Sequence, residues 1–164
     1  MDTLVSVIIG SRSDWQTFKY AADTLRSMSV SHEARIRSVQ RTSDQLVKYA
    51  KSAEERGIRI IIASASVAEH LPGILGSETH ISVLGVPLES KTPDGKDSLL
   101  SMEPTPAGAP VGTFAIGRTG AINAALLAAT MLANDHDEIR KALVEYRAQQ
   151  VTPALHSADS SVAM

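Results

Sequence analysis

Two short polar segments of this chain could hold the phosphate and ribose of a small ligand. The first, at residues 10–14, contains Gly10, Ser11, Ser13 and Asp14. Glycine allows a sharp turn, the carboxylate could bond ribose hydroxyls, and a helix beginning there would add free N–H groups and a dipole that favours an anion. The spacing matches neither a Walker loop nor a GxGxxG fingerprint, so a plain helix cap and tight turn is an equal alternative.

The second polar segment, residues 38–43, contains Ser38 and Arg41. A guanidinium can form a bidentate pair with phosphate, which is a strong and geometrically selective contact. A cation at the start of a helix opposes the helix dipole, so a compensating anion is favoured over a solvated surface charge. Arg41 is therefore a candidate phosphate ligand.

A third segment, residues 63–73, contains His70. A histidine there could act as an acid or base, or as a ligand. A structural histidine bonded to nearby backbone is an equal alternative. The other four histidines are expected at the surface, and no pair of histidines or carboxylates has metal-ligand spacing. We therefore expect neither a metal nor a cofactor.

Each of the three segments follows an expected strand. Strands are expected at residues 4–9, 32–38, 59–65, 81–84 and 111–116. Helices are expected at residues 14–27, from 42 or 43 to 57, from about 68, at 121–133 and at 135–150. Strands alternating with helices predict an α/β fold, a three-layer sandwich with a parallel sheet and helices on both faces. In such folds ligands sit at the carboxyl ends of the strands, where the three segments fall.

The composition narrows the class of protein. The chain is 43% hydrophobic and 4% aromatic with a net charge of −2, which gives no reason to expect nucleic acid or an anionic membrane as a partner. Cysteine is absent, which excludes disulfides and favours a cytoplasmic location. The N-terminal apolar run lacks the basic part of a signal peptide, and no window approaches the ~20 apolar residues of a membrane span. We expect one soluble domain at residues 1–151 and a flexible tail at 152–164.

The expected helix at residues 123–132 has almost no polar face. A helix that is apolar all round must be covered on both sides. The sheet can cover one side, and a second subunit is favoured for the other. Coverage by the last helix of the same chain is the alternative.

Several stretches, taken in order, resemble the PurE family, the carboxyaminoimidazole ribonucleotide mutases and carboxylases of purine biosynthesis. The matching stretches are GSRSDW (residues 10–15), HLPG (70–73), LGVP (84–87), DSLLS (97–101), PVGTFAIG (110–117) and NAALLAA (123–129). The resemblance implies a flavodoxin-like fold and a homo-octamer with the late helices between subunits. It also implies a ribose-phosphate site at Gly10 and the residues matching Ser11, Ser13, Asp14, Ser38 and Arg41.

The chain departs from the family where the chemistry occurs. In the family a carboxylate moves from N5 to C4 of aminoimidazole ribonucleotide, and a histidine in a segment read as SAHRTP removes the C4 proton. Here that segment is SVQRTS, with Gln40 in place of the histidine. A loop read as AGAGGAAH carries Ser64, Ser66, Val67 and Glu69 instead of three glycines and an alanine, and the Gln-Met pair of QMPxGxPVGT is absent from residues 104–113.

The ribose-phosphate half of the site is thus retained, while the parts that handle the base and CO2 are altered together. An amide cannot titrate near neutrality or shuttle a proton. We expect a PurE-like paralogue that binds a phosphorylated ribonucleotide such as aminoimidazole ribonucleotide, with weak or lost mutase activity. The alternatives are an active mutase that uses His70 or another base, a binding or regulatory protein, and an enzyme for a different phosphorylated ligand with Glu69 and His70 as an acid/base pair.

Overall fold

The computed structural model describes residues 2–66, 69–89 and 107–158, with side chains described up to residue 150. The elements in chain order are β1 (Val5–Ile9), the 3-10 turn η1 (Arg12–Asp14), α1 (Trp15–Ser27), β2 (His32–Ile36), α2 (Val39–Ala53), β3 (Ile60–Ala65), α3 (Leu71–Glu78), β4 (Ser82–Pro87), β5 (Gly112–Thr113), α5 (Gly117–Leu132) and α6 (Asp137–Ala158).

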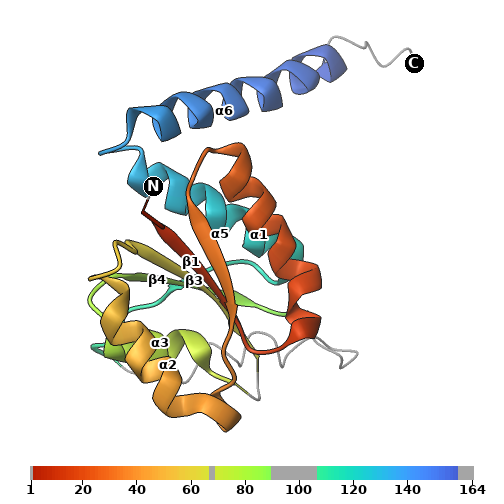
Figure 1. Ribbon diagram of the computed structural model, residues 1–164. Coiled ribbons are helices and arrows are strands. Elements are labelled where there is room, and N and C mark those ends of the chain that lie inside the picture. The colour runs from red at the N-terminus through yellow and green to blue at the C-terminus, as the bar shows by residue number, and fades with distance from the viewer. Residues whose placement is uncertain (1, 67–68, 90–106, 159–164) are drawn as a thin grey trace.

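The strands form one parallel sheet in the order β2-β1-β3-β4-β5. Helices α1 and α5 cover one face, and α2 and α3 cover the other (Figure 1). The predicted three-layer, flavodoxin-like α/β architecture is therefore confirmed. Because all strands are parallel, their carboxyl ends meet at one edge of the sheet.

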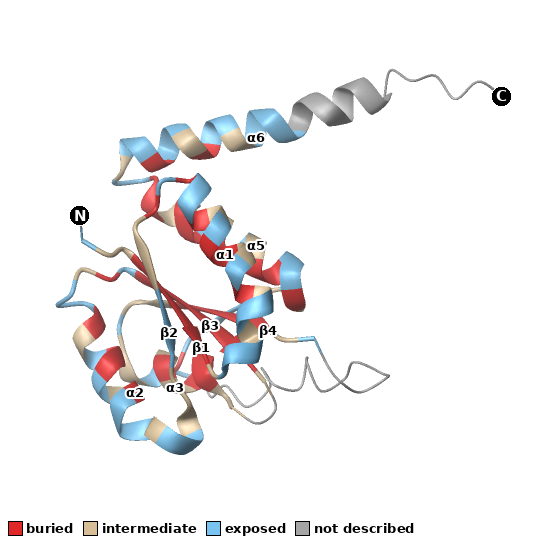
Figure 2. Ribbon diagram, turned by 45° about the vertical axis from the view of Figure 1, so that its right-hand side comes forward, coloured by how far each residue is buried: buried red, intermediate tan, exposed pale blue. Residues whose placement is uncertain are grey.

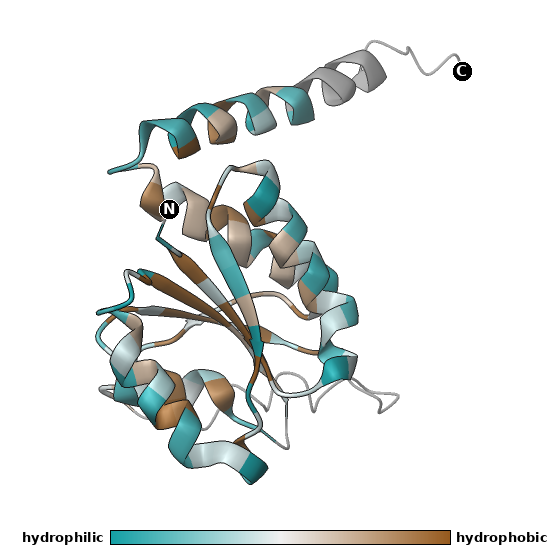
Figure 3. Ribbon diagram, in the orientation of Figure 1, coloured by the Kyte–Doolittle hydropathy of each residue, from teal (hydrophilic) through white to brown (hydrophobic). Residues whose placement is uncertain are grey.

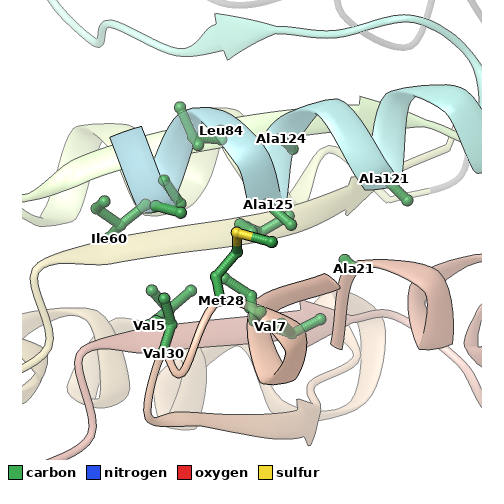
Figure 4. Packing of buried hydrophobic residues seen from close by; sticks show 14 of the residues in the cluster. Val5, Val7, Ala21, Met28, Val30, Ile60, Leu84, Ala121, Ala124 and Ala125 are labelled. Carbon is green, nitrogen blue, oxygen red and sulfur yellow. The ribbon is translucent and has the colours of Figure 1, made fainter. Parts of the chain in front are cut away.

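Alternation along each strand divides the core in two. Val7 and Ile9 of β1 pack toward α1 and α5, whereas Ile8 packs toward α2 and α3. Strands β1, β3 and β4 are almost entirely buried, as expected for strands with helices on both faces (Figure 2). Helix α5 contributes mostly alanines to the core on its side of the sheet, and Met28 reaches toward Ala125 (Figure 4).

Strand β2 differs from the other long strands because it forms the edge of the sheet. It is polar and half-exposed, and its colouring contrasts with the apolar strands beside it (Figure 3). Its one large apolar residue at the exposed end, Ile36, is 45% accessible to solvent. Because an edge strand is partly exposed, it contains fewer apolar residues, and hydrophobicity alone predicts β2 only weakly.

Several element boundaries differ from the sequence expectation: β2 ends at Ile36 and not at residue 38, and α5 begins at Gly117 and not at residue 121. Strand β4 runs through Gly85 to Pro87, because this glycine pairs on both sides with neighbouring strands and does not end the strand. Strand β5 covers only Gly112–Thr113 of the expected residues 111–116. Helix α6 continues to Ala158 instead of ending near residue 150. The flexible tail and the domain limits stay predictions.

The apolar helix α5 is covered mainly by its own chain. Helix α1 and strand β4 pack against it, and α6 packs through the buried residues Ile139 and Leu143. Only part of α5 is left open, with Leu127 42% exposed. The alternative of coverage within the chain therefore accounts for much of this helix, and the second subunit stays a prediction.

Among the residues that the structure describes, no helix is long and apolar enough to cross a membrane.

Candidate functional site

The carboxyl ends of β1, β2 and β3 bring together the polar segments singled out in the sequence. Strand β1 lies between the other two, so Gly10 after β1 is flanked by Ser38 beyond β2 and Ser64 near the end of β3. Residues far apart in the chain thus share one edge of the sheet. This edge is the candidate functional site.

Asp14 is the centre of a hydrogen-bond network at this edge. Its Oδ2 accepts the backbone N–H groups of Gly10 and Ser11 and the hydroxyl of Ser64, all at 3.1 Å. Its Oδ1 accepts the Ser11 hydroxyl at 2.8 Å, and the hydroxyls of Ser11 and Ser13 lie 2.7 Å apart. The carboxylate therefore holds the turn into α1 in shape while the two serine hydroxyls face solvent.

Glu69 enters the same edge from the loop after β3. Its Oε1 accepts the hydroxyl of Ser38 at 2.7 Å, and its backbone N–H donates to Ser66 Oγ at 3.2 Å. Ser38 is the residue before α2, where a serine usually caps the helix through its side chain. Here its hydroxyl is used for Glu69 instead.

Gly10 lies in close contact with Glu69, and its backbone is not left-handed. Its φ is not positive, but a Cβ added to it would overlap Oε2 of Glu69. Its N–H also donates to Ser64 Oγ at 3.1 Å, so the β1 end is tied to the β3 end. The carboxylate of Glu69 thus occupies the space that a side chain at residue 10 would fill.

His70 has an equally close neighbour in its own helix. It precedes α3, and a Cβ on Gly73 would overlap the imidazole Nε2. The glycine of the HLPG segment therefore has a structural explanation, because Gly73 leaves room for the imidazole ring of His70. Glu69 and His70 are adjacent in sequence, but one side chain reaches Ser38 and Gly10 and the other lies against Gly73.

Gln40 and Arg41 occupy the first turn of α2, and both side chains are exposed. The sequence expectation started this helix at residue 42 or 43. In the structure Val39 opens the helix, and the backbone at Thr42 is non-helical, with φ −144° and ψ 40°. The predicted start thus corresponds to a kink, and both residues lie on a separate turn beside Ser38.

Ser64 is the contribution that sequence reasoning undervalued. It was grouped with the altered loop, yet it binds both Gly10 and Asp14. The adjacency of β1 and β3 in a parallel α/β sheet is the signal that could have placed Ser64 beside Gly10 and Asp14.

Glu89 is a second residue at this edge that sequence reasoning missed. It follows β4 and lies against Gly117. Val67 and residues 104–106 lie outside the described residues.

A metal site is not formed by the parts of the chain described. No group of three or more histidines, cysteines or carboxylates is placed to hold an ion there. The hydroxyls, N–H groups and carboxylates at the edge instead fit a hydrogen-bonded organic ligand with hydroxyl groups.

A second polar cluster lies nearer the start of the strands, on the α2 side of the sheet. The buried hydroxyl of Ser6 lies 2.5 Å from that of Tyr49, which donates to Glu33 Oε1. Arg35 and Arg56 pair with Glu33 at 2.8 and 3.2 Å. Arg56 also stacks on Tyr49, with its Cζ 4.4 Å from the ring centre.

Titration in this cluster follows from those contacts. Burial works to raise the pKa of Glu33, but the hydrogen bonds from Tyr49 and Arg35 and the positive charges nearby outweigh it and leave the pKa lowered. Burial, together with the hydrogen bond to Glu33, raises the pKa of Tyr49. The carboxylate is therefore held ionised and the phenol neutral, as expected of a structural cluster.

The fold and the site define an α/β protein with an open parallel sheet and a ligand site at the carboxyl ends of its strands. The family model described as AIR carboxylase matches residues 4–152. The chain therefore belongs to this family, that of PurE in purine biosynthesis, as its sequence motifs indicate.

Curated relatives match nearly the full length. The chain is 47% identical over 159 residues to the N5-carboxyaminoimidazole ribonucleotide mutase of Pseudomonas aeruginosa, covering 97% of this chain and 98% of the relative. It is 51% identical over 150 residues to the mutase of the same name from Brucella melitensis, covering 92% and 93%. A crystal structure of Treponema denticola PurE matches with a TM-score of 0.84 at 23% identity, covering 98% and 99%, which supports the fold.

Proposed function

We propose that this protein binds a phosphorylated ribonucleotide of the aminoimidazole type at the carboxyl edge of β1, β2 and β3, and that its mutase activity is weak or lost. The ribose and phosphate are assigned to Gly10, Ser11, Ser13 and Asp14, with Ser38 and Arg41 completing the set. Support comes from family membership and from the convergence of Asp14, Ser11 and Ser38 at one edge.

The observation that carries the loss of activity is Gln40. This residue occupies the position of the family's proton-transferring histidine, in the exposed first turn of α2 beside Ser38. A carboxamide neither accepts nor releases a proton near neutrality. Loss of a general acid or base costs on the order of 10²–10⁴ in rate, and more where the proton transfer is obligatory.

The test is a mutase assay in both directions on the unmodified protein, Gln40→His and the control Gln40→Asn. We expect Gln40→His to turn over at least about 10²-fold faster than the other two. Family-like turnover by the unmodified protein would contradict the proposal. If that turnover also disappeared in His70→Asn, His70 would be the replacement base and the protein an active mutase.

Assembly and location belong to the same proposal. We expect a cytoplasmic homo-octamer, in which the exposed Leu127 of α5 and Val144 of α6 lie at contacts between subunits; they are 42% and 64% exposed in the single chain. Sedimentation or gel filtration measures the mass directly. A mass near the 17.4 kDa of one chain would contradict the octamer.

A further inference from the structure

The carboxylate of Glu69 lies above the end of β1, within the proposed ligand site. Its Oε1 accepts a hydrogen bond from the hydroxyl of Ser38, which follows β2, at 2.7 Å. Its Oε2 lies in close contact with Gly10. The backbone of Glu69 is tied to Ser66 by N–H bonds in both directions, at 3.2 and 3.3 Å. The residue is thus held at its backbone and at its carboxylate, and it is half-buried.

This carboxylate adds a negative charge beside an existing one. Asp14 already accepts four hydrogen bonds, and its Oδ2 lies 3.5 Å from the place where a Cβ of Gly10 would be. Among the ion pairs of the described residues, none involves Asp14 or Glu69. Ser38 donates to Oε1 of Glu69, and Oε2 lies beside Gly10 at the proposed ligand site.

Resting on the proposed function, we propose that Glu69 makes the site select a ribonucleotide whose base carries an amine and reject one whose base also carries a carboxylate. An amine N–H can donate to Oε2. A ligand carboxylate brought to within a few ångströms of Oε2 would meet a like charge at the partly desolvated edge, where such repulsion is much stronger than in water. Glu69 is therefore a specificity-determining residue.

The experiment is calorimetry with three probes: aminoimidazole ribonucleotide, its C4-carboxylated form and ribose 5-phosphate. The proteins are the unmodified chain, Glu69→Gln, Glu69→Ala and, as a matched control, Glu55→Gln, which removes the same charge from an exposed position past the end of α2. Gln keeps an oxygen for the Ser38 hydroxyl, so this variant retains the local structure.

We expect the unmodified protein to bind the uncarboxylated ribonucleotide at least about tenfold more tightly than the carboxylated one. Repulsion between two carboxylates at a partly desolvated site weakens binding by about that factor. Glu69→Gln and Glu69→Ala should reduce this ratio to about threefold or less, and Glu55→Gln should preserve it. Ribose 5-phosphate should bind the unmodified protein, Glu69→Gln and Glu55→Gln alike, because each keeps an acceptor for the Ser38 hydroxyl.

Two results would overturn the inference while leaving the proposed function standing. One is equal affinity of the unmodified protein for both ribonucleotides. The other is an equal gain for all three probes in Glu69→Gln, which would mean that Glu69 repels the phosphate and does not read the base. Failure of every probe with every variant would instead overturn the proposed function itself.

Discussion

Two clusters of carboxylates and hydroxyls lie along β1 and β2, one nearer the start of these strands and one beyond their carboxyl ends, and they differ in what balances their charge. Near the start of the strands, Glu33 is paired with Arg35 and Arg56 and accepts the Tyr49 hydroxyl. At the carboxyl edge, Asp14 and Glu69 are bound by serine hydroxyls and backbone N–H groups, and no ion pair of the described residues involves them.

The difference separates a structural role from a functional one. A half-buried carboxylate that is paired and fully hydrogen-bonded contributes to folding and has little capacity left for a ligand. A carboxylate held only by neutral donors keeps its charge available to whatever enters the site. Charge balance therefore distinguishes the two clusters better than their composition does.

The largest effect is expected at Glu33. Glu33→Ala leaves the Tyr49 hydroxyl and two arginines without their acceptor, so the free energy of unfolding should fall by about 2–3 kcal/mol, measured by urea denaturation. Affinity for the ribonucleotide should stay the same. A stability change no larger than that of the control Glu55→Ala would show that the cluster is not structural.

The converse substitution is Asp14→Asn. The amide preserves shape but removes the charge that we assign to ribose hydroxyls, so calorimetry should show an affinity loss of about tenfold, or about 1.4 kcal/mol. Unfolding free energy should change by less than about 1 kcal/mol, since the amide oxygen can still accept from the backbone. A large stability loss with unchanged affinity would place Asp14 with Glu33 as a structural residue.

A smaller loss is expected for Arg41→Ala. Arg41 is exposed, so solvent weakens its pairing with phosphate, and we expect about a fivefold lower affinity for ribose 5-phosphate. Lys48→Ala, which removes an exposed positive charge further along the same helix, is the control and should leave the affinity unchanged. Unchanged affinity in Arg41→Ala would remove Arg41 from the phosphate site.

The smallest effect is a pH dependence of stability. The pKa of Glu33 is lowered on folding from its ordinary value of 4.5, so the stability from its ionised form is present above that value. It is lost as the pH falls from about 4.5 through the lowered folded pKa. Melting temperature against pH should therefore fall less steeply in this acid range in Glu33→Gln than in the unmodified protein, and parallel curves would contradict the assignment.

Much of the fold is predictable because each buried parallel strand appears in the sequence as a continuous apolar run. The apolar runs of β1 and β3 and the glycine or serine that follows each give strand, loop and helix in order, and the motifs GSRSDW and HLPG follow these two strands. The edge strand β2 and the two-residue β5 are less evident, since exposed strands lack a continuous apolar run.

The candidate site is only partly predictable. Residues 10–14 were identified from one continuous segment, whose contacts are local. The bonds of Ser64 to Asp14 and of Glu69 to Ser38 join residues 50 and 31 positions apart, and spacing along the chain carries no direct signal for such pairs. The Ser6–Tyr49–Glu33 cluster was missed for the same reason.

The sequence by itself determined the layer architecture, the family and the loop at Gly10 as the start of a ligand site, because hydrophobic periodicity and contiguous motifs are local properties of the chain. Only the tertiary structure decided that Glu69 lies beside Gly10, and that Glu33 is bound by Tyr49 and Arg56 while no ion pair of the described residues involves Asp14. These facts depend on which strand ends become neighbours, and that is fixed by packing of the whole sheet.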